Sequence, residues 1–254
     1  MINPTNLRKH VLKMIFEKQS GHWGGSASLA EIVAFLFNEF DPLGKDKIIL
    51  SKGHAVPILY AALVEAGVIP IEELTTFREV NSRLQGHPVH WLIPELQATT
   101  GSLGQGLSIA IGHAMAKKLK KEEGLVFCIV GDGEMQEGQN YEGLMFASKY
   151  KLDNLVVLLD TNKAQNDGLV GDTMPISNLR MVVEGFGWRY ANLDGHNYDL
   201  LVKCKKFFNY PGPPKFLKLD TIKGKGVSFM ETPEWHSKVP NAEEFKLAME
   251  ELNA

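Results

Sequence analysis

The sequences VFCIVGDGEMQEG, residues 126–138, and LVVLLDTNKAQNDG, residues 155–168, decide the fold of this 254-residue chain. Each begins with an uninterrupted apolar run and then reaches a carboxylate and a turn of glycine or asparagine. Such a run is typical of a strand that is buried on both faces of a parallel sheet. We therefore predict two parallel strands whose polar groups emerge at their carboxyl ends, where open α/β sheets bind ligands.

Asp132 and Asn162 follow those two strands and stand thirty positions apart. A strand, a crossover helix and a second strand fit this spacing, so we expect both side-chain oxygens to meet at one point. A carboxylate and an amide oxygen are hard ligands that suit Mg²⁺, which keeps its other positions for phosphate oxygens and water. The pair therefore predicts a magnesium site beside a phosphate.

Strand and helix patterns alternate along the rest of the chain, which predicts an α/β fold. We expect a single three-layer domain over residues 1–254, with a mainly parallel sheet flanked by helices. Further strands are predicted at 47–50, 187–195 and 215–222, and further helices at 5–18, 30–40, 56–66, 71–79, 178–185, 198–208 and 242–252. Ser28 and Glu31 fit a capping box for the helix at 30–40, whose apolar residues lie nearly all round.

Composition and charge exclude several classes of protein. The net charge is −3 and the pI is about 6.3, so nothing favours binding to nucleic acid or to an anionic membrane. No run of about 20 apolar residues predicts a membrane span, and the charged N-terminus does not resemble a signal peptide. Cys128 and Cys204 form no metal or redox motif, which fits a reducing, cytoplasmic location.

Glycine motifs narrow the ligand. No segment supplies the P-loop pattern, and a dinucleotide fingerprint that starts at Gly131 would need glycine where Gln136 stands. The run TTGSLGQG, residues 99–106, opens a predicted helix and offers free N–H groups to an anion or a heterocycle. Taken alone, this run is better explained as a glycine turn that opens a helix and binds no ligand.

Four of the eight histidines lie in turns that contain glycine or proline, namely His22, His54, His87 and His236. One loop histidine is usually a solvated surface residue, but four in separate turns predict a functional cluster. His10 and His113 lie on predicted helices and have no expected chemical role. We place His90 and His196 on the surface by default.

Together these motifs resemble the N-terminal domain of the transketolase family of thiamine diphosphate enzymes. They follow one another in the family's order: SGHWG at 20–24, LSKGHA at 50–55, QGHP at 85–88, TTGSLGQG at 99–106, GDGEMQEG at 131–138, DTNK at 160–163, and KGKG with EWH at 223–236. The resemblance covers nearly the whole chain. It implies the thiamine diphosphate-binding fold, with thiamine diphosphate and Mg²⁺ as cofactors and Ca²⁺ or Mn²⁺ as substitutes.

The resemblance also assigns roles by matching position. The metal ligands would be Asp132, Asn162 and the carbonyl of Ala164. The cofactor-binding residues would be His54, Gly101, Leu103, Gly131, Asp132, Gly133, Glu137, Asn162 and His236. The catalytic histidines would be His22, His54, His87 and His236, with the first three lining a funnel above the reactive carbon. Glu137 resembles a buried interface glutamate that couples paired active sites; the alternative is an ordinary surface glutamate.

Transketolases have further domains that this sequence does not match. We expect the pyrimidine-binding and C-terminal domains on a separate chain, which would combine with this one as an α₂β₂ tetramer. The expected reaction transfers a two-carbon ketol unit from a ketose, phosphorylated or not, to an aldehyde acceptor. The chain alone would be inactive.

Three positions depart from the family pattern: Trp23 follows His22, the loop at 90–94 is apolar around Trp91, and Ser237 follows the last histidine. The two tryptophans motivate an alternative in which a narrower funnel takes a less polar acceptor, as in a deoxyxylulose-phosphate-synthase-like or specialised-metabolite transferase. Ordinary drift explains them equally well. A second alternative is a non-catalytic scaffold of the same fold.

Overall fold

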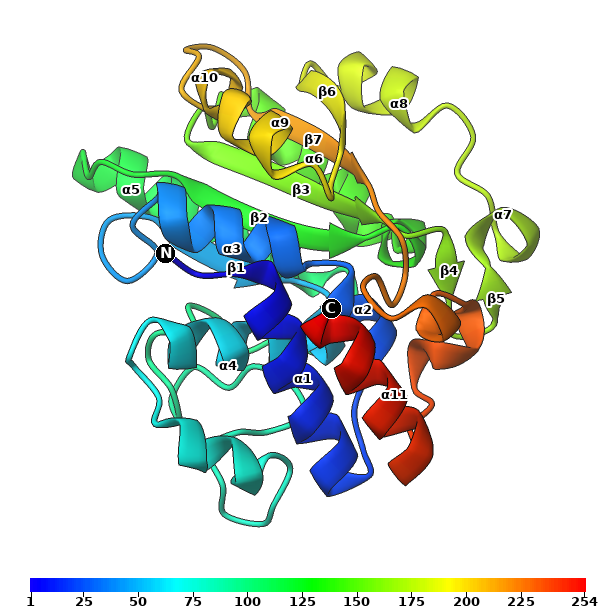
Figure 1. Ribbon diagram of the computed structural model, residues 1–254. Coiled ribbons are helices and arrows are strands. Elements are labelled where there is room, and N and C mark those ends of the chain that lie inside the picture. Colours follow the sequence, from blue (N-terminus) through cyan, green and yellow to red (C-terminus); the bar gives the residue numbers. More distant parts are fainter.

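A computed structural model describes all 254 residues as alternating helices and strands (Figure 1). The strands are β1 (Lys47–Leu50), β2 (Val126–Gly131), β3 (Leu155–Thr161), β4 (Ala164–Gln165), β5 (Gly168–Leu169), β6 (Arg189–Asp194) and β7 (Lys215–Asp220). The helices are α1 (Pro4–Lys18), α2 (Trp23–Ala27), α3 (Ala30–Glu39), α4 (Val56–Glu65), α5 (Gln105–Lys120), α6 (Gly138–Lys149), α7 (Val170–Thr173), α8 (Leu179–Gly185), α9 (Tyr198–Lys203), α10 (Lys205–Phe208) and α11 (Ala242–Asn253). Short 3₁₀ turns lie at Gly53–Ala55, Ile71–Thr76, Gly133–Gln136, Ser228–Met230 and Pro233–His236.

Five strands form one parallel sheet in the order β1-β2-β3-β7-β6, and β4 and β5 form a small antiparallel hairpin beside it. The chain lays down β1, β2 and β3 side by side, crosses to the far edge as β6, and returns as β7 next to β3. All five strands therefore end at the same edge, and the loops after β1, β2, β3 and β7 meet there. The predicted α/β fold with a mainly parallel sheet is confirmed.

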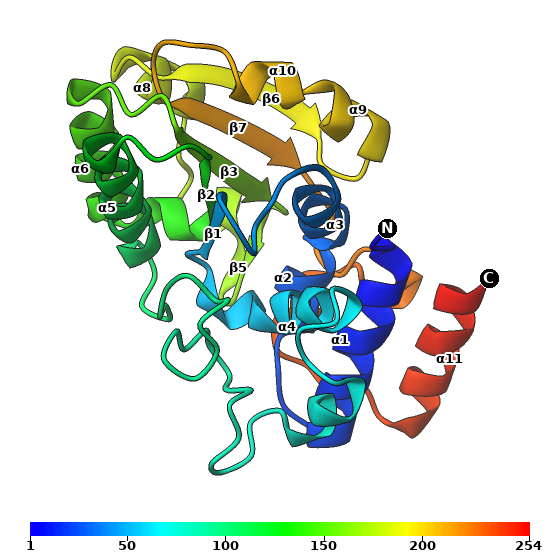
Figure 2. The ribbon, with the colours of Figure 1, turned by 90° about the vertical axis from the view of Figure 1, so that its left-hand side faces the viewer.

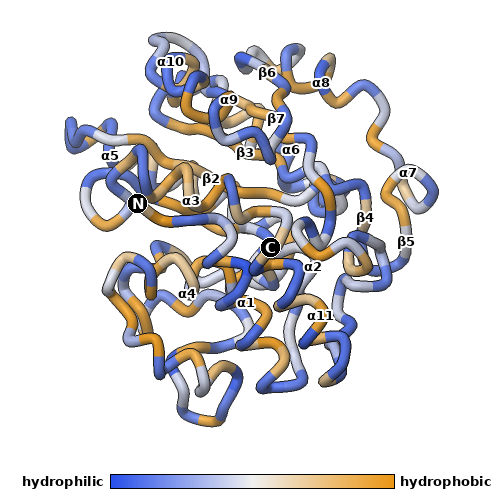
Figure 3. The backbone as a smooth tube through the Cα atoms, viewed as in Figure 1, coloured by the Kyte–Doolittle hydropathy of each residue, from blue (hydrophilic) through white to orange (hydrophobic).

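The two faces of the sheet carry separate apolar layers because successive side chains along a strand point to opposite sides. Along β2, Val126, Cys128 and Val130 pack against α5, α6 and α8, whereas Phe127 and Ile129 pack with α3 and the N-terminal helices. Figure 2 shows these helices on either side of the sheet, and Figure 3 shows hydrophobic residues concentrated along β2 and β3. The central strands are thus buried on both faces.

Helices α1, α2, α4 and α11 pack together below the sheet in Figure 1. They share one apolar cluster with α3 and one face of the sheet. Helix α2 brings the turn at 20–24 to the carboxyl edge of the strands. No helix is both long enough and apolar enough to cross a membrane.

Local details differ from the sequence predictions at several element ends. The predicted capping box is wrong: Ser28 has helical backbone angles, and Leu29 caps α3 without a side-chain bond because α2 runs directly into it. Ser28 Oγ instead donates to Asp160, and Glu31 binds Arg8 and His196. Helix α1 begins one residue earlier than predicted, capped by Asn3, and the predicted helix at 198–208 is broken at Cys204.

Candidate functional site

A cavity of about 600 Å³ opens at the carboxyl edge of the sheet. Its walls come from the loops after β1, β2, β3 and β7, together with α2 and the loop that precedes α5. All twelve predicted site residues line it: His22, His54, His87, Gly101, Leu103, Gly131, Asp132, Gly133, Glu137, Asn162, Ala164 and His236. Leu103 and Ala164 are the two hydrophobic residues of the lining, and the others are polar, charged or glycine.

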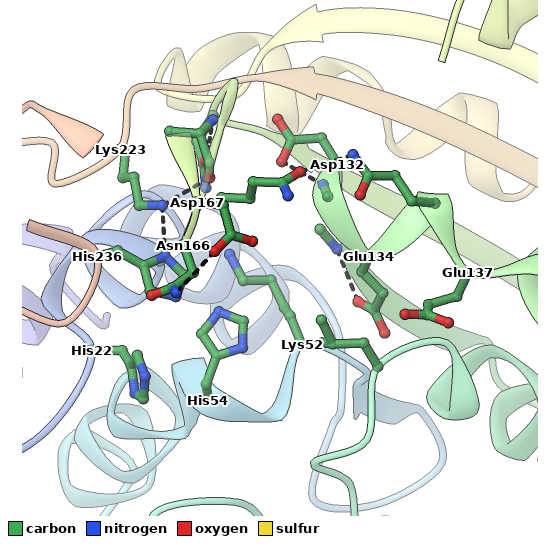
Figure 4. Close-up of a pocket in the computed structure, with 18 of the residues that line it drawn as sticks. His22, Lys52, His54, Asp132, Glu134, Glu137, Asn166, Asp167, Lys223 and His236 are labelled. Atoms are coloured by element: carbon green, nitrogen blue, oxygen red, sulfur yellow. Dashed lines mark hydrogen bonds between the residues drawn. The ribbon is translucent and has the colours of Figure 1, made fainter. Parts of the chain in front are cut away.

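Three of the predicted histidines form a triangle on one side of the cavity (Figure 4). The ring centroids of His22 and His54 are 5.2 Å apart, and each lies 5.4 Å from that of His236. Burial, together with the charge of Arg78, lowers the pKa of His22 to about 4. Burial and Lys223 lower the pKa of His236 to about 3, and burial and Lys52 hold the pKa of His54 well below its ordinary value. The imidazoles are therefore neutral at pH 7.

His87 lies beside Gly101, and this residue is more exposed than the other three histidines. Burial, with a smaller contribution from Arg78, lowers its pKa as well. The loop at 84–104 thus adds a fourth neutral imidazole to the cavity.

Lys223 fixes the orientation of His236. Its ammonium nitrogen lies 2.6 Å from Nδ1 of His236 and 2.8 Å from the carbonyl oxygen of Ala164. Because the ammonium can only donate, Nδ1 accepts and the ring proton sits on Nε2. Burial and Lys52 lower the pKa of Lys223 to about 8, which leaves it charged at pH 7.

The oxygen donors after β2 and β3 lie together, as the spacing predicted. Asp132 accepts hydrogen bonds from the N–H groups of Gly133 at 2.9 Å and Lys163 at 2.6 Å, but forms no salt bridge. Burial and the nearby Asp160 raise the pKa of Asp132 to about 6. The side-chain oxygen of Asn162 accepts from the N–H of Ala164 at 3.2 Å.

No three His, Cys, Asp or Glu side chains gather as a metal cluster. The available donors are instead one carboxylate, one amide and one backbone carbonyl. A half-buried carboxylate with a raised pKa and no salt bridge is a site where a divalent cation would be favoured. This donor set fits a hard cation that keeps several water or phosphate ligands.

Asp160 is a buried hub below the cavity that the sequence reasoning missed. Its carboxylate accepts from Lys52 at 2.5 Å, from Ser28 at 2.8 Å, from the amide of Asn162 at 3.2 Å, and from Thr221. Burial opposes its charge, yet the Lys52 ammonium and these hydrogen bonds hold the pKa of Asp160 below its ordinary value. A carboxylate at the end of an apolar run was the available signal, since a buried charge needs a partner.

Glu134 is a second carboxylate that was missed. Its side chain accepts from the N–H of Gly104 at 2.9 Å, from the N–H of Gly131 at 3.0 Å, and from Ser51. The residue is 3% exposed, and burial raises the pKa of its carboxyl group. It ties together the loop after β1, the end of β2 and the start of α5. Glu137, in contrast, is exposed at the cavity rim.

The tryptophans do not narrow the cavity. Trp23 is fully buried in the apolar core, Trp91 is 73% exposed, and neither lines the cavity. Ser237 is exposed and also lies outside the lining. The sequence observation that favoured a less polar acceptor therefore loses its structural basis.

The surface placement of His196 is also wrong. Its side chain is 13% exposed and bonds to Glu31 and to the backbone of Ile222. Sequence offered no signal, because Glu31 lies 165 positions away.

A parallel α/β sheet with oxygen donors and a cavity at the carboxyl ends of its strands is typical of domains that bind a cofactor there. Residues 4–253 match the family model described as "Transketolase, thiamine diphosphate binding domain". The chain therefore belongs to the thiamine diphosphate-dependent transketolase family, which confirms the resemblance read from the motifs.

Relatives of similar length are named as subunits. The chain is 34% identical to a subunit of the apulose-4-phosphate transketolase of Phocaeicola vulgatus, over 97% of this chain and 91% of the relative. It is 38% identical to a subunit, SqwG, of the 6-deoxy-6-sulfo-D-fructose transketolase of Clostridium sp., over 97% of this chain and 93% of the relative.

Longer relatives match over one part only. The chain is 42% identical to transketolase of Homo sapiens over 86% of this chain, which is 36% of the human protein. The crystal structure of transketolase from Campylobacter jejuni superposes with a TM-score of 0.91 at 28% identity, over 98% of this chain and 42% of that chain. This chain is thus similar to a thiamine diphosphate-binding N-terminal subunit.

Proposed function

We propose that this chain is the diphosphate-binding subunit of a two-subunit transketolase. It would take part in moving a two-carbon ketol unit from a ketose to an aldehyde acceptor. The observation that carries the proposal is that Asp132 and Asn162 line one cavity together with a triangle of neutral imidazoles, and Figure 4 shows Asp132 across from His22, His54 and His236. Thiamine diphosphate, when bound, supplies a sink for the carbanion that ketol transfer requires.

Asp132, Asn162 and the carbonyl of Ala164 would hold Mg²⁺. The Asp132 carboxylate has two backbone hydrogen bonds and no salt bridge, so a divalent cation would supply the charge that it lacks. Ca²⁺ or Mn²⁺ would substitute, since oxygen ligands also suit these ions. Lys223 donates to the Ala164 carbonyl in the structure, and the second lone pair of that oxygen would remain available to the metal.

The diphosphate would lie between the N–H of Gly133 and His236. Lys223 holds the proton of His236 on Nε2, which makes that nitrogen a hydrogen-bond donor. Gly101 and Leu103 would contact the rings of the cofactor, and Glu137 at the rim would face a neighbouring subunit.

The remaining histidines would handle the substrate. His22, His54 and His87 are neutral at pH 7, so each can donate to one sugar hydroxyl and accept from another, or move a proton. The buried Nδ1 of His22 has no partner within the chain. Two relatives are named for a ketose phosphate and a sulfonated ketose, so the donor we propose is a ketose with an anionic end.

A separate C-terminal subunit would complete the site, in an α₂β₂ assembly. The relatives that are named as subunits imply a second chain, and the lining has only two hydrophobic side chains to pack against an aromatic cofactor. We also propose a cytoplasmic location, which the two free cysteines favour.

Cofactor binding tests the proposal. Calorimetric titration of the chain with thiamine diphosphate in Mg²⁺, repeated with the captured partner subunit present, should give saturable, Mg²⁺-dependent binding. Asp132→Asn should weaken it at least about tenfold, since a hydrogen-bonded charge contributes about 1.5–3 kcal/mol. Asp199→Asn, on the surface of α9, is the matched control and should bind normally. Absence of binding even with the partner would favour the scaffold alternative.

A further inference from the structure

A buried chain of polar groups runs from α1 to the loop after β7. Arg8 donates from both terminal nitrogens to the Glu31 carboxylate, each at 2.7 Å. His196, in the turn between β6 and α9, places Nδ1 2.9 Å from that carboxylate and Nε2 2.8 Å from the backbone nitrogen of Ile222. The Arg8 side chain is 6% exposed, and those of Glu31 and His196 are each 13% exposed.

The hydrogen bonds allow only one form of the His196 ring. The N–H of Ile222 can only donate, so Nε2 must be without a proton and the ring proton must sit on Nδ1. There it is donated to Glu31. Burial opposes the charge of Glu31, yet its bonds from His196 and Arg8 lower the pKa of Glu31 to about 2. The His196 ring is thus held at both nitrogens, by the Glu31 carboxylate at Nδ1 and by the N–H of Ile222 at Nε2.

Ile222 lies between two residues that reach the cavity region. Thr221 donates to the Asp160 carboxylate, and Lys223 donates to Ala164 and His236. The sheet ladder ends at Thr221, whose N–H bonds to the carbonyl of Thr161 at 3.2 Å. The Ile222 side chain is 40% exposed, so apolar burial does little to fix the backbone here. The bond to His196 holds the N–H of Ile222, and the next backbone tie along the segment is the bond from the N–H of Gly224 to the carbonyl of Gly24, at 3.0 Å.

We propose that His196 is a positioning residue for the cavity, because its Nε2 fixes the backbone that presents Thr221 and Lys223. Loss of that acceptor would loosen the backbone around Ile222, within the segment at 221–226, and so weaken the placement of the Lys223 ammonium between Ala164 and His236. The inference rests on the proposed function only for the effect on cofactor affinity. The effect on the loop stands independently.

Two substitutions test the two ring nitrogens of His196 separately. In His196→Gln the amide oxygen replaces Nε2 as the acceptor for Ile222. In His196→Asn the shorter amide keeps a donor for Glu31 but leaves the Ile222 N–H without a partner. If His196 only stabilised the fold, the two substitutions would have similar effects on hydrogen exchange and on cofactor affinity. His10→Asn is the matched control, since His10 also pairs with a glutamate, Glu65, at 2.9 Å, but away from the cavity.

The first readout is the rate of amide hydrogen exchange at residues 221–226 in the full chain, measured by mass spectrometry. The unfolding midpoint of each variant is measured as well. We expect exchange about tenfold faster in His196→Asn, as one hydrogen bond is lost, and near wild type in His196→Gln and His10→Asn. Equal exchange in the two His196 variants would overturn the inference. If His196→Asn does not fold, fast exchange in His196→Gln would overturn it and wild-type exchange would support it.

The second readout is the Kd for thiamine diphosphate in Mg²⁺, under the conditions in which the wild type binds. His196→Asn should raise it about tenfold and His196→Gln should leave it within about threefold, since one hydrogen bond separates them. Wild-type affinity in both variants would overturn the cavity role. If the wild-type protein binds no thiamine diphosphate, the proposed function fails, whereas loop exchange still decides whether His196 positions the segment.

Discussion

Single residues in the cavity are held in charge states that their neighbours dictate. Burial keeps the histidine triangle neutral, while the Lys52 ammonium keeps Asp160 charged. Neutral rings exchange hydrogen bonds with hydroxyl groups, and a fixed carboxylate orients the polar groups around it. The chemistry of the site therefore depends on protonation states that can be measured.

The histidines make stability fall in mild acid. Below pH 6.5 the unfolded chain takes up protons on His22 and His236, whereas the folded chain does so only near pH 4 and pH 3. The unfolded state thus binds more protons, and the free energy of unfolding decreases as the pH falls from 6.5 toward 4. His22→Gln should reduce this slope by up to about 1.4 kcal/mol per pH unit, measured by urea unfolding at several pH values. An unchanged slope would contradict the depressed pKa of His22.

The buried pair of Lys52 and Asp160 gives a second prediction at this scale. Lys52→Met should destabilise the protein by about 3–5 kcal/mol, because it leaves the Asp160 carboxylate buried without its cation. Adding Asp160→Asn removes that charge, so the double variant should recover part of the loss. Urea unfolding of the two single variants and the double variant measures the coupling. Additive losses would show that the two groups act independently.

At the scale of elements, α5 begins at a glycine whose place allows no side chain. Gly104 has φ of 80°, and a Cβ added there would lie 2.7 Å from Cβ of Glu137. Its N–H donates to the buried Glu134, so the start of α5 is fixed against the end of β2. The helix opening thereby sets the wall that carries Leu103.

Two glycines of α5 should respond oppositely to alanine. Gly104→Ala should destabilise the protein by more than about 1 kcal/mol, since it combines a left-handed backbone with a close contact. Gly112→Ala, in the exposed middle of the same helix and with no atom within 4 Å of the added Cβ, should stabilise it by about 0.5–1 kcal/mol. Thermal unfolding of both variants tests the contrast, and equal shifts would contradict it.

The sequence predicted which segments are helices and which are strands, because the spacing of apolar residues along a segment depends on which of its own faces is buried. The apolar runs at 126–131 and 155–161 indicated buried strands, and these strands pair in the structure. The turn residues that follow the runs placed Asp132 and Asn162 at the carboxyl ends of the strands. The predicted capping role of Ser28 was wrong because α2 runs directly into α3 and because the hydroxyl group of Ser28 bonds to Asp160, which lies 132 positions away. Such long-range partners leave no local pattern.

The same limit explains the parts of the site that were missed. Asp132, Asn162 and the loop histidines stand in motifs, so sequence located them. Asp160, Glu134 and the Arg8–Glu31–His196 chain acquire their roles from contacts between distant elements. Burial of a charge, rather than its neighbours in sequence, identifies these residues.

At the scale of the whole molecule, the cavity is lined mainly by polar, charged and glycine residues. Four strand ends, α2 and the loop before α5 converge on it, and Leu103 and Ala164 are its two hydrophobic residues. Aromatic rings are held by packing against apolar side chains. We therefore expect a second subunit to supply such side chains and to be needed for activity.

The need for a second subunit is tested by measuring ketol transfer by the chain alone and by the complex that it captures from its native cells in Mg²⁺ and thiamine diphosphate. We expect no transfer by the isolated chain, and transfer from a ketose phosphate by a stoichiometric complex with a second chain. Asp132→Asn should abolish transfer by that complex. Full transfer by the isolated chain would show that no second subunit is needed, and a complex that binds the cofactor but transfers no ketol unit from any ketose would show that the protein is not a transketolase subunit.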